Sequence, residues 1–176
     1  MSRLVVAMIV SVSLAGCGAW DTMSTSAKGS GAGLQAVLRY GGVLSGSGQG
    51  DIRFADRGDG VLMTLSVTNL RSGVYRVAIH QNPICSSQNL YSAGPVWEPA
   101  GNTRPAREMM PELVTDSDGD GNLTAQIPGI HTTGPDGLQG RSVVLHSGTR
   151  IEDAEPGKSN DRVLCGVLGP TLSFAF

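Results

Sequence analysis

The sequence predicts an all-β protein built as an antiparallel sandwich or barrel. Its composition combines 25 glycines with only 5% aromatic and 16% charged residues, which gives many turn formers and few bulky anchors. About eight short segments alternate between apolar and polar residues, as half-buried strands do. No other segment has a convincing helical pattern. These observations together favour short strands joined by glycine-rich turns.

The alternation is clearest in two neighbouring segments. In residues 60–70 the positions from Val61 to Val67 that share one face are apolar, whereas the other face carries threonine and serine. Residues 73–81, GVYRVAIHQ, follow after a short turn, and we expect Val77 and Ile79 to face the core. Arg76, Ala78 and His80 are then expected on the opposite side. The remaining predicted strands are 34–40, 51–57, 112–116, 122–128, 141–147, 162–169 and 171–176.

The turn between 112–116 and 122–128 reads Ser-Asp-Gly-Asp-Gly, a strong hairpin signal. The run from Asp116 to Gly121 also matches the start of a calcium-binding loop. However, the twelfth position of such a loop is Ile127, so the bidentate glutamate is missing. A plain turn is the preferred interpretation, and weak calcium binding is the alternative.

The N-terminus resembles a bacterial lipoprotein leader. Arg3 precedes a short apolar run that ends in Leu-Ala-Gly-Cys at Cys17. The run has the length of a signal-peptide core and is too short for a transmembrane helix. We therefore expect residues 1–16 to be a signal peptide, 17–33 to be the lipidated cysteine and a flexible tether, and 34–176 to be the β-barrel domain. A plain secretory signal is the alternative.

This leader predicts where the protein resides and what it contacts. A lipidated Cys17 would anchor the chain to a membrane of the bacterial cell envelope, with the domain facing the periplasm. Gly18, in place of aspartate, favours the outer membrane. The net charge of −2 and the lack of a basic run argue against nucleic-acid binding. A homodimer is compatible with the sequence, and no protein partner can be identified from it.

Cysteine usage leaves two residues for the domain. Of the three cysteines, the leader takes Cys17, which leaves Cys85 and Cys165 in a compartment that permits disulfides. From the residues alone they are either a bridge or two free thiols.

Four motifs resemble the copper-zinc superoxide dismutase family, and they occur in the family's order. They are GVYRVAIH (73–80), CSSQNLYSAGPVWEP (85–99), GRSVVLH (140–146) and RVLCGVLG (162–169). The resemblance implies an eight-stranded Greek-key β-barrel or sandwich, a disulfide between Cys85 and Cys165, and an active-site role for Arg162. That role is to guide the superoxide anion, and the alternative is that Arg162 anchors a loop.

The resemblance also implies that the metal site is incomplete. Family copper sites use four histidines, and only His80 and His146 stand at matching positions. Ala78 occupies the position two residues before His80, and Val96 follows the Ala-Gly-Pro run where the bridging histidine is expected. The segment that supplies further zinc ligands contains no histidine, and Glu112 is the only acid near the carboxylate position. Copper, bound weakly or not at all, is therefore the candidate cofactor, and zinc is not expected.

Two interpretations of function follow. The first is a dismutase-like envelope lipoprotein with little or no dismutase activity, because two copper ligands and the zinc site are missing. The alternative is a copper-dependent superoxide dismutase with a non-standard site, or a weak copper-binding protein. Met109 and Met110 are candidate extra ligands, since thioethers suit Cu(I), although packing is the preferred interpretation of this pair.

Overall fold

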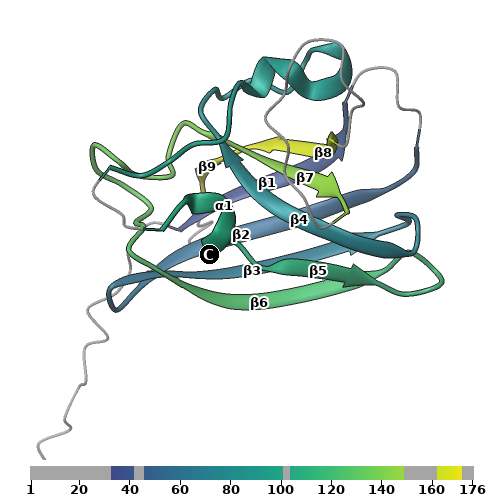
Figure 1. Cartoon of the computed structure of the whole chain (residues 1–176), viewed down its shortest axis with the longest axis horizontal. Helices are drawn as coiled ribbons and strands as arrows, with labels where there is room; N and C mark the ends of the chain where they lie inside the picture. The colour runs from purple at the N-terminus through teal and green to yellow at the C-terminus, as the bar shows by residue number, and fades with distance from the viewer. Residues whose placement is uncertain (1–32, 42–45, 101–103, 149–161, 172–176) are drawn as a thin grey trace, which may run out of the picture.

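The computed structural model describes residues 33–41, 46–100, 104–148 and 162–171. It confirms the all-β prediction, since strands dominate these ranges (Figure 1). Within them, no helix is long and apolar enough to cross a membrane. The strands are β1 (Leu34–Tyr40), β2 (Gln49–Arg57), β3 (Gly60–Thr68), β4 (Gly73–His80), β5 (Glu112–Thr115), β6 (Gly121–Pro128), β7 (Ser142–Ser147), β8 (Arg162–Val167) and β9 (Gly169–Pro170).

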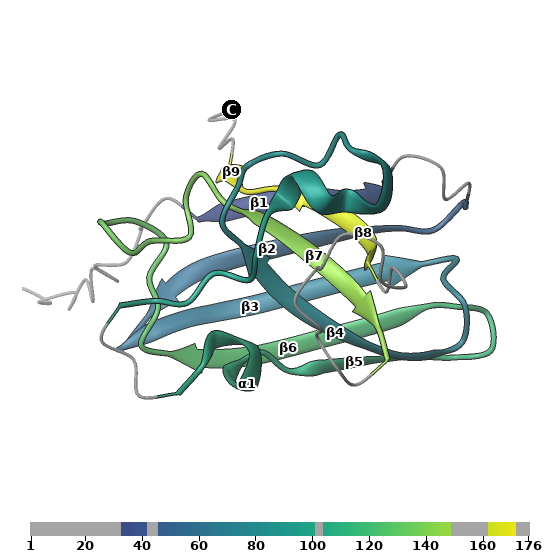
Figure 2. The same cartoon turned by 45° about the horizontal axis from the view of Figure 1, so that its top comes forward.

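The strands form one antiparallel sheet in the order β5-β4-β7-β8-β1-β2-β3-β6, and β9 adds to β1. Its two ends, β5 and β6, are joined by the short turn 116–120, so the sheet curls into a nearly closed eight-stranded barrel (Figure 2). The connections from β3 to β4 and from β6 to β7 join strands that are not neighbours, as in a Greek key. The predicted barrel is thus confirmed.

The turn between β5 and β6 packs against the connection between β3 and β4. The carboxylate of Asp116 accepts hydrogen bonds from the backbone N–H groups of Asp118 (3.0 Å) and Asp120 (2.9 Å). Gly119 has φ +83°, and a Cβ at this position would lie 1.8 Å from the carbonyl oxygen of Leu70. Asp116 therefore stabilises a tight turn whose fourth position only glycine fits.

The interior of the barrel is aliphatic. The alternation predicted for β3 is present, with Val61, Met63, Leu65 and Val67 all buried. Val77 and Ile79 of β4 also point into this core, as the sequence predicts. Trp97 and Met110 close it at the side of the long β4–β5 connection.

Two short helical segments in that connection were not expected. A 3₁₀ segment, η1 (Gln88–Ala93), lies against β8, and a single helical turn, α1 (Ala106–Met109), precedes β5 (Figures 1 and 2). Pro105 and Pro111 flank α1 and limit it to one turn, because proline suits a helix start and disfavours helix before it. The predicted strand 171–176 lies almost wholly outside the described residues, as do the predicted leader and tether.

Candidate functional site

The four positions that the resemblance assigns to copper lie on one outer face of the barrel. Ala78 and His80 are two residues apart on β4, so their side chains share a face. Val96 forms an isolated bridge with His80, and paired residues also share a face. On β7, His146 pairs with Arg76 and Val144 pairs with Ala78. The fold therefore brings His80, His146, Ala78 and Val96 to the same side, opposite the core-facing Val77 and Ile79.

The two histidines contact each other directly. Their Nε2 atoms are 3.1 Å apart. The ring planes differ by 15° and the ring centroids are 5.3 Å apart. Nearly coplanar rings at these two separations meet edge to edge rather than face to face. Both side chains are fully buried.

The strand register explains how the rings meet. His80 pairs with Ser142, whereas His146 pairs with Arg76, so the two histidines are offset by four residues along the ladder. That offset is about 13 Å at the rise of a β-strand. The rings must reach toward each other along the diagonal, over the intervening pair of Ala78 and Val144. The methyl group of Ala78 leaves room for this contact.

A backbone carbonyl fixes the tautomer of His80. Its Nδ1 lies 2.8 Å from the carbonyl oxygen of Gly94, which can only accept a hydrogen bond. Nδ1 of His80 must therefore carry a proton, and the Nε2 of the neutral ring presents a lone pair. In the contact between the rings, His146 then supplies the hydrogen from its own Nε2.

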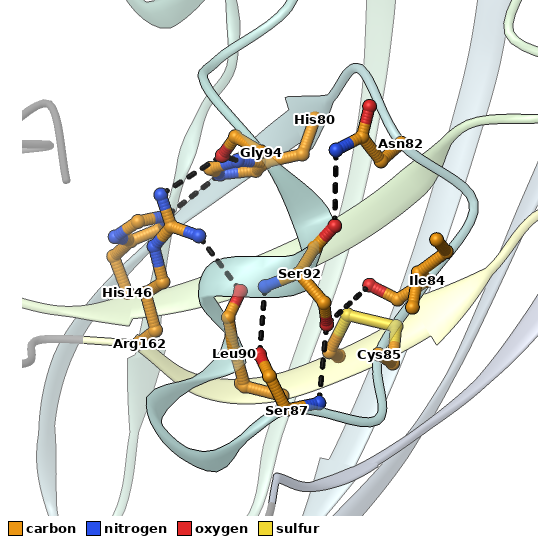
Figure 3. Close-up of a disulfide and its surroundings, with 11 residues drawn as sticks. His80, Asn82, Ile84, Cys85, Ser87, Leu90, Ser92, Gly94, His146 and Arg162 are labelled. Atoms are coloured by element: carbon orange, nitrogen blue, oxygen red, sulfur yellow. Dashed lines mark hydrogen bonds between the residues drawn. A yellow bond between two sulfur atoms is a disulfide. The ribbon is translucent and has the colours of Figure 1, made fainter.

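Arg162 holds the segment that covers the histidines (Figure 3). Its guanidinium donates to the carbonyl oxygens of Leu90 (2.8 Å) and Gly94 (3.0 Å), and it lies over the ring of Tyr91 at 5.4 Å. Only 1% of this residue is exposed to solvent. Leu90 adopts a left-handed conformation with φ +58°. The geometry fits the loop-anchoring alternative for Arg162, and anion guidance stays a prediction.

A β-bulge turns Arg162 toward the histidines. In the β7–β8 ladder the register shifts between Leu145 and His146, so that His146 pairs with Arg162 rather than with Val163. Alternation from the core residue Leu164 would otherwise direct residue 162 inward. The bulge therefore places the guanidinium on the outer face, and the sequence pattern gave no indication of it.

The predicted disulfide is present. Cys85 in the covering loop bonds to Cys165 on β8, with the two Cα atoms 5.7 Å apart. Beside it, the backbone N–H of Ser92 donates to Oγ of Ser87 (2.7 Å), and the N–H of Ser87 donates to Oγ of Ser92 (3.1 Å). The bridge ties residues 81–97, here termed the covering loop, to β8, and the reciprocal serine bonds hold the loop's own turn together (Figure 3).

A second arginine holds the far end of the covering loop. The guanidinium of Arg141 lies 4.3 Å from the centroid of the Trp97 ring, and its Nε donates to the carbonyl oxygen of Gly137 (2.8 Å). Burial lowers the pKa of Arg141, and the charge of Asp136 opposes that shift. The backbone N–H of Trp97 also donates to Ile79 (2.8 Å), which fixes Val96 beside His80.

The donor set at the copper positions is smaller than the metals implied by the resemblance require. Among the described residues, no group of three or more His, Cys, Asp or Glu side chains could hold a metal ion. Glu112 forms an ion pair with Arg76 at 2.6 Å. Met110 is in the barrel core and Met109 packs against it. The site thus offers two imidazoles, which do not meet the four-ligand preference of Cu(II) or the tetrahedral set of zinc.

Several residues that shape this site carry no signal in the sequence. The carbonyls of Leu90 and Gly94 act through the backbone, which sequence motifs do not report. Ser142 is fully buried, and its Oγ has no hydrogen-bond partner within the described part of the chain. The unbroken burial of β7 from Ser142 to His146 marks a strand covered on both faces, and its apolar run SVVL is the one sequence feature that could have indicated this.

Comparisons with known proteins agree with this fold. Residues 48–168 match a family model described as copper/zinc superoxide dismutase. The chain is 28% identical to superoxide dismutase [Cu-Zn] of Deinococcus radiodurans, over 70% of this chain and 79% of that protein. It is 26% identical to superoxide dismutase [Cu-Zn] of Pasteurella multocida, over 68% and 73%. A solved structure titled clock protein EA4 superposes with a TM-score of 0.62 at 26% identity, covering 79% of this chain and 94% of that one.

Proposed function

This chain belongs to the copper/zinc superoxide dismutase family, and we propose that it is a lipoprotein of the bacterial cell envelope with little or no dismutase activity. The observation that carries the proposal is the donor set at the copper positions. Two imidazoles meet there, whereas the side chains of Ala78 and Val96 on the same face have no lone pair and cannot bind a metal.

Dismutation needs a metal that cycles between two oxidation states at a preorganised site. Copper supplies that chemistry in this family, and Cu(II) prefers a tetragonal set of nitrogen and oxygen ligands. Arg162 attracts anions only where its charge reaches solvent, whereas here it is buried and holds the carbonyls of Leu90 and Gly94. Zinc has no matching donor set among the described residues. Arg162 and the two carbonyls that it binds thus stabilise the covering loop rather than open a route for superoxide.

The envelope half of the proposal rests on the leader. Leu-Ala-Gly-Cys ends the apolar run at Cys17, and a Gly/Ser/Thr-rich tether precedes β1. Lipidation of Cys17 would anchor the chain to the outer membrane and leave the barrel in the periplasm. A Cys17→Ala variant is expected to leave the membrane fraction or to stall before processing. Maturation and membrane fractionation equal to those of the parent would contradict the anchor.

A dismutase assay on the copper- and zinc-loaded protein tests the catalytic half. Family enzymes can approach the diffusion limit, about 10⁹ M⁻¹s⁻¹, and we expect this chain to be several orders of magnitude slower. The double variant Ala78→His/Val96→His restores four imidazoles on one face and should raise both copper affinity and activity. Adding His80→Gln to that variant is the matched control and should remove the gain.

The second candidate function is copper binding or copper-dependent dismutation at a non-standard site. It is favoured by the His80–His146 contact, in which a carbonyl already orients one lone pair toward the partner ring. High activity in the unmodified protein, lost in His80→Gln or His146→Gln, would support this candidate and overturn the proposal. Met109 and Met110 would then be the first residues to test for a ligand role.

A further inference from the structure

The outer face of β2, β3 and β6 carries a hollow of about 400 Å³. In the sheet, β3 lies between β2 and β6 and pairs with both (Figure 2). The copper positions lie elsewhere, on β4, β7 and the covering loop. The volume of the hollow falls within the range of small-ligand pockets, about 300–1,000 Å³. A binding site here would therefore be separate from the proposed metal chemistry.

Differences in side-chain length explain the hollow. The middle strand contributes the short side chains of Thr64 and Ser66 to its lining, whereas β2 contributes Asp51 and Arg53. The strand register pairs Arg53 with Thr64 and Asp51 with Ser66, and paired residues share a face. Across the ladder to β6, the partners of the two hydroxyl residues are Thr124 and Asn122. Short residues on β3 thus form a floor, and longer residues on the neighbouring strands stand beside it.

The lining is polar and its charges balance. Asp51 and Arg53 are two residues apart on one strand, so their side chains point to the same face about 7 Å apart along the strand. Both are exposed, and within the described ranges no hydrogen bond or ion pair engages either side chain. The arginine offers only donors and the ionised aspartate only acceptors, whereas Thr64, Ser66 and Asn122 offer both.

This lining distinguishes ligands by their charge and polarity. An anion is attracted by Arg53 but repelled by Asp51, and a cation meets the opposite pair of effects. An apolar ligand would take both charged groups out of water without giving them a partner, which costs free energy. Each hydroxyl group of a neutral sugar both donates and accepts hydrogen bonds. A neutral polyhydroxyl ligand can therefore satisfy both charged groups at once.

The sheet itself argues against an extended peptide as the ligand. Peptides that add a strand need a free sheet edge, whereas β3 is paired on both sides. Apolar side chains flank the hollow on the same outer face. Leu62 is half-buried on β3, and the exposed Val37 pairs with Asp51. They can cover the C–H surface of sugar rings next to the hollow, which favours a chain of sugars over a single one.

We propose that the outer face of β2, β3 and β6 binds a neutral glycan chain. Asp51 accepts and Arg53 donates hydrogen bonds to hydroxyl groups of one sugar, which lies over Thr64 and Ser66. Water competes for each of these bonds on an open face, so each contributes little net affinity. We therefore expect dissociation constants of about 0.1–1 mM. The inference goes beyond the proposed function and depends neither on the leader nor on the copper positions.

The test is an NMR titration of the full chain carrying Cys17→Ala, which leaves no free thiol once the Cys85–Cys165 bridge has formed. Cellotetraose, maltotetraose and tetra-N-acetylchitotetraose are the neutral probes, and tetragalacturonate is the acidic probe. For at least one neutral probe we expect amide shifts confined to β2, β3 and β6. These shifts should be insensitive to salt, because the ligand carries no charge to screen.

Three outcomes of this titration would overturn the proposal. The first is an absence of shifts with all three neutral probes. The second is a set of shifts confined to another face of the barrel. The third is tighter, salt-sensitive binding of tetragalacturonate, which would make the face an anion site that depends on Arg53.

Variants of the lining locate the ligand. Arg53→Met removes the charged donor and Thr64→Leu fills the floor, and each should weaken binding at least 10-fold. Gln49→Ala changes an exposed residue of β2 that points to the same side but lies outside the hollow, so binding should be unchanged. Urea midpoints show whether each variant is folded. Binding equal to that of the parent in both Arg53→Met and Thr64→Leu would overturn the site, and it would leave the proposed function unaffected.

Discussion

Two outer faces of the same barrel differ in whether a loop covers them. On the face formed by β2, β3 and β6, side chains that point away from the core meet solvent. A shallow hollow of about 400 Å³ there is lined by residues that include Arg53, Thr64 and Ser66. On the face formed by β4, β7 and β8, the covering loop lies over the outward side chains, and Ala78, His80 and Val144 are fully buried.

The difference shows that the burial of a strand face depends on what lies over it, not on sequence alternation alone. β3 alternates because only its inner face is buried, whereas β7 is buried at five consecutive positions from Ser142 to His146. His80, His146 and Arg162 on the covered face bind one another or the loop backbone, as most buried polar groups do. Stability should therefore depend on contacts at the covered face far more than on those at the open face.

The largest effect is expected from removing the bridge. The disulfide closes 80 residues of sequence, and its loss in Cys85→Ala/Cys165→Ala should lower the free energy of unfolding by about 4.5 kcal/mol in the chain-entropy model. Urea unfolding measures this change, and Cys17→Ala is the control with no expected effect. A loss below about 1 kcal/mol would show that other contacts are enough to hold the covering loop.

Arginines on the two faces provide the next comparison. Arg162→Met leaves the carbonyls of Leu90 and Gly94 without their charged donor and should cost about 3 kcal/mol. Arg53→Met makes the same change on the open face and should stay within about 0.5 kcal/mol. Urea midpoints for the two variants measure the contrast. Equal losses would mean that the covering loop does not depend on its anchor.

A reciprocal exchange of valine and threonine tests the two faces without changing side-chain shape. Val144→Thr places a hydroxyl on the covered face between Leu90 and Cys165, and it should cost about 2 kcal/mol. Thr64→Val on the open face should change stability by less than about 0.5 kcal/mol. Thermal unfolding of both variants measures the difference. A destabilising Thr64→Val would instead indicate an ordered role for the open face.

The smallest effect is expected at the edge of the covered face. Glu112 is 40% exposed in its ion pair with Arg76, and exposed pairs contribute about 0.2–1 kcal/mol. Glu112→Gln should therefore lower stability by about 0.5 kcal/mol, less at high salt. Zinc binding, measured by calorimetry in the same variant, should be unaltered. A drop in zinc affinity would give Glu112 the ligand role that its sequence position suggested.

Sequence patterns predicted the inner face of the barrel better than the covered outer face. Alternation along residues 60–70 placed Val61 to Val67 in the core correctly, because one buried face repeats every second residue. The family resemblance correctly predicted the Cys85–Cys165 bridge, whereas the copper ligands that it implies stay a prediction. It could not predict the contact between His80 and His146, which depends on ladder register, on the size of Ala78 and on a carbonyl of the covering loop.

The bulge between β7 and β8 has a consequence for insertions and deletions. Arg162 faces outward because Val163 is the extra residue of the bulge in β8, opposite the junction of Leu145 and His146, and leaves His146 to pair with Arg162. If Val163 paired with His146 in a regular ladder, the guanidinium would rotate into the aliphatic interior. Deleting Val163 would also make the pairing regular, but Arg162 would then directly precede Leu164 and stay opposite His146, on the outer face. Most substitutions of Val163 would leave that orientation intact, since they keep the residue count. At this site the register of the ladder, rather than the identity of one side chain, determines which side of the barrel carries the charge.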